Sequence, residues 1–191
     1  MGGPSAGILF PAPLSDATKV AVREEIHRLT PSIEGDDFWI EGSPFILSFG
    51  FEYEEVTQEY EENRVPEIIG WMPRDKITFI AMCNDAHSHR VLAELCTHFS
   101  QKMGGLIDLC GSLTPLISDE LKQLFHDEYI LGKTFNWASW EPHVQNTFKD
   151  FPGKVYTVVY TPDRGGTCAY HICDVKFLEA WMRQPHFHMI K

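Results

Sequence analysis

Residues 77–103 carry the strongest structural pattern of this 191-residue chain. Ile77–Cys83 is apolar almost throughout, which favours a central strand. Asn84 and Asp85 can cap a helix that begins after them, since short polar side chains accept hydrogen bonds from the first turn of a helix. A helix over 86–103 is predicted by apolar residues at spacings of three and four: Leu92, Leu95, Cys96, Phe99 and Met103. Glycines 104 and 105 end this helix, because glycine enters the left-handed conformation without steric cost.

The remaining segments are mostly short apolar or alternating runs separated by turn residues. Strands are expected over 6–10, 38–40, 45–53, 106–110, 154–161 and 167–173, and helices over 16–29, from 118, over 142–149 and over 175–183. Hairpin-like pairs dominate and no repeating strand–helix unit is present. We therefore predict a single α+β domain over residues 1–191, with a mainly antiparallel or mixed sheet and helices packed on one side.

The charge balance limits the partners of the chain. It has 27 acidic against 16 basic residues and a net charge of −11. An acidic surface repels phosphate backbones and anionic lipids, so we expect no nucleic-acid and no membrane partner. No apolar run is long enough to cross a membrane, and the N-terminus lacks a secretory signal. The five cysteines form no CxxC pair, which favours free, buried thiols and a cytoplasmic location.

Residues 52–67 form a strongly acidic stretch with interleaved tyrosines. One interpretation is a solvated loop or an edge strand kept from aggregating by its charge. The other is a surface shaped for a basic partner, in which glutamates steer association and tyrosines act as anchors. The second interpretation assigns partner contacts to Glu52, Tyr53, Glu54, Glu55, Glu59, Tyr60, Glu61 and Glu62.

The sequence contains no persuasive catalytic or metal-binding motif. His87 and His89 diverge on a helix, and His186 and His188 lack an evident third ligand. Cys168 and His171 point to opposite faces of a strand, and Asp174 is better explained as a helix cap. We therefore expect no catalytic residue, no metal site and no cofactor.

Several segments resemble a bacterial family of unknown function, DUF6368. They are residues 2–7, 103–108, 152–156, 170–174, 177–181 and 185–191, so the resemblance spans nearly the whole chain. Compact acidic families of this kind are similar to immunity proteins, which neutralise toxins delivered between bacteria by contact-dependent or type VI secretion. The resemblance implies a class of function and assigns no residue roles.

Together, the acidic stretch and the resemblance lead to one expected function and two alternatives. The expected function is a cytoplasmic immunity protein that binds a cognate basic toxin domain and occludes its active site. The first alternative is a small hydrolase that uses His171 or the His186/His188 tail. The second is a non-catalytic homodimeric scaffold, since the sequence leaves the oligomeric state open.

Overall fold

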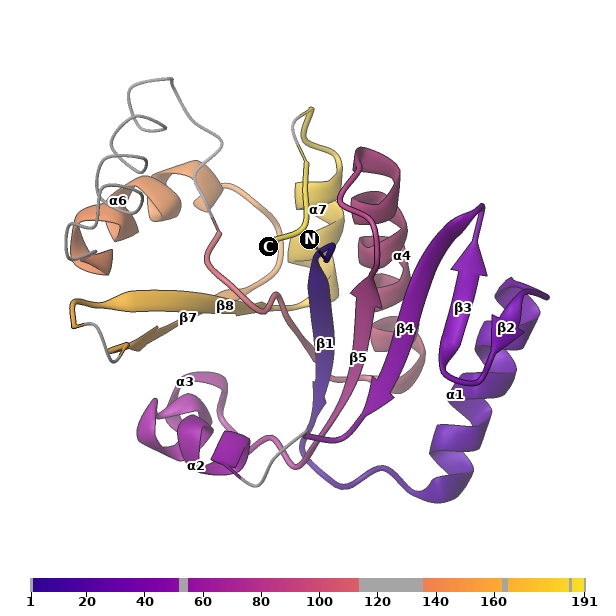
Figure 1. The fold of residues 1–191 in the computed structure, drawn as a ribbon. Helices are drawn as coiled ribbons and strands as arrows, with labels where there is room; N and C mark the ends of the chain where they lie inside the picture. The colour runs from indigo at the N-terminus through magenta and orange to yellow at the C-terminus, as the bar shows by residue number, and fades with distance from the viewer. Residues whose placement is uncertain (1, 52–54, 114–135, 163–164, 186, 191) are drawn as a thin grey trace.

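The structure is a computed structural model that describes residues 2–51, 55–113, 136–162, 165–185 and 187–190, with the backbone alone for 55–57. Its described part is a mixed α+β domain built on one sheet, as the sequence predicts (Figure 1).

Eight strands form the sheet in the order β2-β3-β4-β5-β1-β6-β8-β7, and every neighbouring pair is antiparallel. Strand β1 lies in its interior between β5 and β6, whereas β2 and β7 are the edges. The strands are β1 (Ser5–Phe10), β2 (Ile33–Glu34), β3 (Asp37–Ile40), β4 (Ser43–Phe49), β5 (Asp75–Ala81), β6 (Leu106–Asp108), β7 (Val155–Tyr160) and β8 (Cys168–Cys173).

Helices cover both faces of this sheet. They are α1 (Asp16–Leu29), α2 (Glu55–Glu62), α3 (Val65–Ile69), α4 (Ala86–Met103), α6 (Trp137–Phe148) and α7 (Val175–Met182). Figure 1 shows α6 and the α2–α3 pair on opposite sides of the β7–β8 hairpin. The prediction of helices on one side only is therefore wrong, because α2 and α3 pack on the second face.

The larger core lies between the sheet and helices α1, α4, α6 and α7. The rings of Phe79 on β5 and Phe99 on α4 have centroids 5.3 Å apart, and Leu92 of α4 is fully buried in the same core. Trp181 of α7 is 1% exposed and packs edge-on against Phe148 of α6. These contacts bury the apolar stripe that predicted the long helix over 86–103.

A smaller core lies on the opposite face, under α2 and α3. Tyr60, Val65 and Ile69 from these helices are buried against the sheet. Their partners on the strands are Leu9 of β1, Val158 of β7 and Ile172 of β8. Strand β1 therefore contributes apolar side chains to both cores, with Ile8 in the larger and Leu9 in the smaller one.

Most predicted elements are confirmed, and helices α1 and α4 have the predicted bounds. Helix α6 begins at Trp137, five residues before the predicted start at Pro142. Pro142 removes one backbone hydrogen bond and its ring crowds the carbonyl of the preceding turn, but burial of Trp137, Trp140 and Val144 on one face offsets this cost. The helix predicted from 118 lies outside the described residues.

Asp174 ties the end of the sheet to the last helix. One carboxylate oxygen accepts a hydrogen bond from the Phe177 N–H at 2.9 Å, which caps α7. The other accepts from the Lys154 N–H at 2.9 Å, beside the start of β7. The same side chain therefore fixes two elements that are adjacent in space.

We predict that Asp174→Ala lowers the free energy of unfolding by about 1–2 kcal/mol, because it removes the cap and the link to Lys154. Asp174→Asn keeps an acceptor for the helix and should lose only part of this. Urea titrations followed by circular dichroism would measure both. Equal stabilities of the alanine variant and the unmodified chain would contradict this role.

Candidate functional site

The described part of the acidic stretch, from residue 55 onward, forms helix α2 and the start of α3, and is not an edge strand. Helix α2 is joined to α3 through Arg64, which has a left-handed backbone conformation. Glu59, Glu61 and Glu62 are exposed, and we refer to these three residues as the acidic surface. The nearby Glu67 is also exposed, but Arg64 forms an ion pair with it.

The structure places the predicted partner-contact residues unequally. Glu52, Tyr53 and Glu54 lie outside the described residues, and for Glu55 only the backbone is described, within α2. Glu59, Glu61 and Glu62 lie on the surface as expected.

The prediction that Tyr60 is a surface anchor is wrong. Its side chain is 4% exposed and faces the sheet. Successive helical residues are turned by about 100°, so Tyr60 points inward while Glu59 and Glu61 flank it on the outside.

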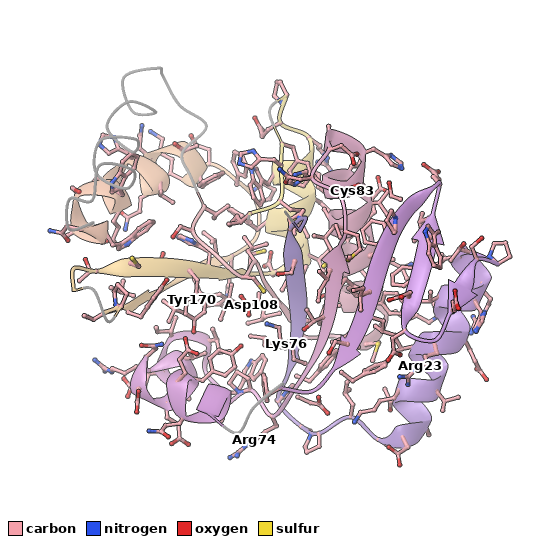
Figure 2. All side chains as sticks on the ribbon, in the orientation of Figure 1. Arg23, Arg74, Lys76, Cys83, Asp108 and Tyr170 are labelled. Atoms are coloured by element: carbon pink, nitrogen blue, oxygen red, sulfur yellow. The ribbon has the colours of Figure 1, made fainter. Side chains whose placement is uncertain are left out.

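Tyr60 belongs to a group of buried polar side chains under the acidic surface. Its hydroxyl donates to Asp108 Oδ2 at 3.4 Å, and its ring packs edge-on against Phe51 with centroids 5.6 Å apart. Lys76 Nζ donates to the same Asp108 oxygen at 2.8 Å. We refer to Tyr60, Lys76 and Asp108, with the adjacent Tyr170, as the polar cluster. Figure 2 shows Lys76, Asp108 and Tyr170 close together, between β1 and the β7–β8 hairpin.

The sheet is shaped to hold this cluster. Lys76 lies on β5 and Asp108 at the end of β6, on either side of β1. Gly7 of β1 is paired with Asp108, and a side chain at Gly7 would collide with the Lys76 side chain. Because Gly7 has no side chain, the lysine can cross the central strand to reach the carboxylate. Asp108 Oδ1 accepts a further hydrogen bond from the Cys110 N–H at 2.9 Å.

The charges in the cluster are well defined. Burial disfavours the charged form of Lys76, but the adjacent Asp108 carboxylate outweighs it and holds the lysine pKa well above its usual value. Burial also raises the pKa values of Tyr60 and Tyr170, so both phenols stay protonated. The cluster thus contains an ion pair and two neutral phenols. The hydrogen bond from Tyr60 to Asp108 makes this arrangement suited to positioning α2.

His171 lies on the opposite face of β8, in the larger core. It is fully buried, and its Nδ1 accepts a hydrogen bond from the Leu113 N–H at 3.0 Å. Burial lowers its pKa to about 4, so the ring is neutral with its proton on Nε2. Nε2 has no hydrogen-bond partner among the described residues.

The residues considered for chemistry do not assemble around His171. Asp174 caps α7, as predicted, and Cys168 lies three positions along the strand, on its other face. His186 lies outside the described residues, and His188 is exposed and contacts the Trp181 ring. Among the described residues, no group of three or more histidine, cysteine or acidic side chains is placed to hold a metal ion.

The cysteines differ in part from expectation. All five are free, and Cys96 and Cys173 are buried as predicted. The prediction of buried thiols is wrong for Cys83 and Cys110, which are exposed. Both lie just past the end of a strand, where the chain leaves the sheet.

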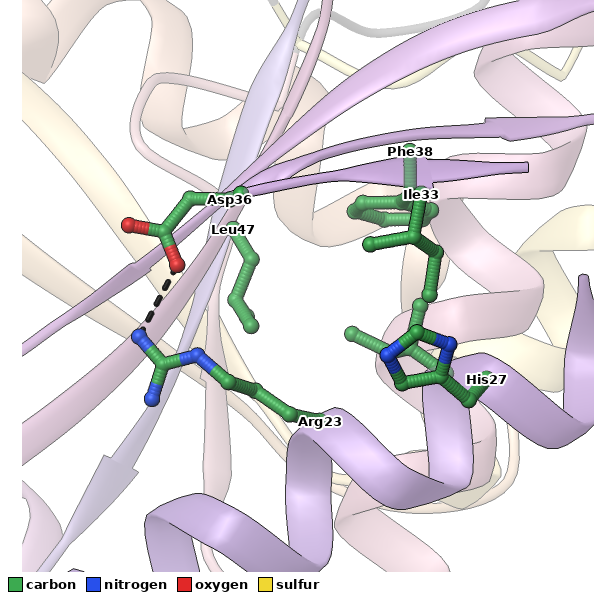
Figure 3. Close-up of a pocket in the computed structure, with 8 residues that line it drawn as sticks. Arg23, His27, Ile33, Asp36, Phe38 and Leu47 are labelled. Atoms are coloured by element: carbon green, nitrogen blue, oxygen red, sulfur yellow. Dashed lines mark hydrogen bonds and ion pairs between the residues drawn. The ribbon is translucent and has the colours of Figure 1, made fainter. Parts of the chain in front are cut away.

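A small depression lies between α1 and the β2–β3 edge. Figure 3 shows Arg23 and Asp36 at its rim, joined by an ion pair of 2.8 Å, with Phe38 and Leu47 on its walls. Its volume of about 30 Å³ suits a water molecule and is too small for an organic ligand.

The polar cluster is the part of the site that sequence reasoning missed. A usable signal was present, since Asp108 is the one acid within the apolar run 106–110, and Lys76 immediately precedes the apolar run from Ile77. A charge inside a predicted buried strand requires a partner. The pairing could not be read from the sequence, because β5 and β6 are not neighbours and β1 separates them.

The profile of DUF6368, described as a family of unknown function, matches residues 2–191. The chain belongs to DUF6368. No curated protein and no solved structure matches the chain. No helix among the described residues of this DUF6368 member is long and apolar enough to span a membrane.

We predict that Asp108→Ala lowers the free energy of unfolding by about 3–5 kcal/mol, because it leaves the Lys76 cation buried without a counter-charge. The double variant Lys76→Met with Asp108→Leu removes both charges and should recover much of this loss. Urea unfolding would provide the values, with Asp150→Ala as an exposed control. A loss no larger than that of the control would rule out a structural ion pair.

His171 gives a prediction about pH. The folded protein keeps this ring neutral down to pH about 4, whereas the unfolded chain protonates it near pH 6.5. The unfolded state binds more protons between these values, so acidification through this window should cost up to about 3 kcal/mol of stability. In His171→Asn, the amide oxygen can replace Nδ1 as acceptor for the Leu113 N–H. Its free energy of unfolding should fall less steeply between pH 6.5 and 4, and parallel curves would contradict the prediction.

Proposed function

We propose that this DUF6368 member is a non-catalytic immunity protein that binds a basic toxin domain through the acidic surface on α2 and occludes the active site of the toxin. The proposal rests mainly on the exposed glutamates of α2, a helix that is attached to the sheet through the buried side chain of Tyr60. The proposed place of action is the cytoplasm, whose reducing conditions suit five free thiols.

The acidic surface is available to a partner. Among the described residues, Glu59, Glu61 and Glu62 form no ion pair, and Arg64, the next basic residue along the chain, is paired with Glu67. Glu62 only accepts a hydrogen bond from the Gln58 amide at 2.7 Å. Unneutralised carboxylates on one helix raise the local concentration of a cationic partner and speed its association.

The buried contacts supply a second requirement for tight inhibition, which is a preorganised surface. Tyr60 joins α2 to Asp108, while Val65 and Ile69 fix α3 to the same face of the sheet. A surface already held in position loses little conformational entropy when a partner binds. An inhibitor interface of standard size buries about 800 Å² on each partner, so the three glutamates would form only part of it.

A matched pair of triple variants tests the proposal. Glu59→Lys, Glu61→Lys and Glu62→Lys reverse the acidic surface. Glu24→Lys, Glu34→Lys and Glu94→Lys make the same change in net charge on α1, β2 and α4, where the residues are also exposed. The genes beside that of this chain would first be searched for a large secreted protein with a variable carboxy-terminal domain. Each variant would then be co-expressed with that domain, and the association rate would be measured by stopped-flow fluorescence.

The expected result is protection of growth by the unmodified chain and by the control triple. The α2 triple should bind at least about tenfold more slowly at low salt, and the difference should shrink as salt rises. Equal association rates for the two triple variants would show that the acidic surface is not part of the interface. If the unmodified chain does not protect cells against that toxin domain, the proposed immunity function is wrong.

A further inference from the structure

Strand β7 is an unusually unprotected sheet edge. Its sequence, VYTVVY, contains no charge and no proline, and it extends over six residues. Proteins commonly protect edge strands by making them short, charged or bulged. The opposite edge, β2, follows this rule, since it has two residues and one of them is Glu34. By the same reasoning, an edge such as β7 is suited to pair with another strand.

The register shows which backbone groups of β7 face outward. The Asp174 N–H donates to the Lys154 carbonyl oxygen at 3.0 Å, so Lys154 directs its backbone toward β8. Antiparallel pairs alternate, and the backbone groups of Val155, Thr157 and Val159 therefore point to the outer edge. No described strand lies on that side.

A groove accompanies this edge, between α6 and β7. Its volume is about 490 Å³, which is in the range of ligand sites. Val155 and Thr157 line it, so the residues with outward backbone groups also form its wall. Three aromatic rings that pack on one another close its apolar side, with centroids 5.1 to 5.8 Å apart: Phe148, Phe151 and Phe177.

The charge of the groove is opposite to that of the protein. Lys149 and Lys154 are its charged lining residues, both are exposed, and neither pairs with a described carboxylate. The lining also includes the neutral His171, whose buried Nε2 has no acceptor among the described residues. The two lysines therefore make the groove cationic within a chain whose net charge is −11.

We propose that this groove binds an extended acidic peptide segment of a partner protein, which adds to the sheet as a strand beside β7. The main chain of the peptide pairs with the outward groups of Val155, Thr157 and Val159, and alternate side chains enter the groove. Its carboxylates lie near Lys149 and Lys154. A second copy of this chain would bring its own uncharged β7 and leave both lysines without a counter-charge. The site is separate from the acidic surface and does not rest on the immunity function.

Fluorescence anisotropy tests this with a short fluorescein-labelled peptide that alternates valine and threonine and ends in two aspartates. The same peptide ending in two lysines is the charge control. We expect the aspartate peptide to bind and the lysine peptide to bind at least about tenfold more weakly. Equal affinities, or no binding of the aspartate peptide, would overturn the proposal.

Protein variants separate the two kinds of contact. Thr157→Pro removes one outward N–H at an edge position where proline is tolerated, and Thr157→Val keeps it. The proline variant should lose at least about tenfold in affinity and the valine variant should not. Lys149→Glu with Lys154→Glu should weaken binding similarly, whereas Lys19→Glu with Arg74→Glu changes the charge equally away from the groove. Circular dichroism and thermal unfolding would establish that each variant is folded.

Hydrogen exchange gives a direct readout of strand pairing. The aspartate peptide should slow exchange of the Thr157 and Val159 amides, which point outward, in the unmodified protein. Unchanged exchange would contradict strand addition even if the peptide binds. Light scattering identifies the competing occupant: an unmodified dimer that becomes monomeric in Thr157→Pro would show that a second copy covers β7, and would overturn the proposal.

Discussion

The arrangement of this protein depends on a central strand with apolar side chains on both faces. Ile8 and Leu9 of β1 are each fully buried, and they point to opposite sides of the sheet. Exposing either one would cost about 1.5–3 kcal/mol, so both faces of the sheet need a cover near β1. Helix α4 covers one face and the α2–α3 pair covers the other. The acidic helix is therefore held in place by the need to bury the second face.

The ion pair of the polar cluster makes the position of α2 on the sheet more specific. Burial of Lys76 and Asp108 carries a desolvation cost, and such pairs seldom stabilise a fold more than apolar residues would. Their contribution here is directional, because Asp108 also accepts the Tyr60 hydroxyl and so defines where α2 lies. A purely apolar contact would cover the sheet equally well but would leave the helix freer to shift. A binding surface benefits from the more specific arrangement.

Local patterns predicted the fold better than they predicted the site. The bounds of α1 and α4 follow from capping residues and apolar spacing, which act within a few residues. Tyr60 was misplaced because a charge run hides helical periodicity, so this inward residue was interpreted together with its acidic neighbours. Lys76 and Asp108 were missed because their pairing depends on strand order and on the absence of a side chain at Gly7, and both are long-range features.

The β7–β8 hairpin separates two surfaces of opposite character. On one side, α3 packs against β7 near the acidic surface, and on the other, α6 and β7 frame a groove with two lysines that form no ion pair with a described carboxylate. Because strand side chains alternate, Tyr156 and Val158 face the first surface while Val155 and Thr157 face the second. A bound strand at the β7 edge would contact the groove through its own alternate residues and need not displace α2. The two surfaces can therefore be occupied independently, and a cationic partner on one would not compete with an acidic segment in the other.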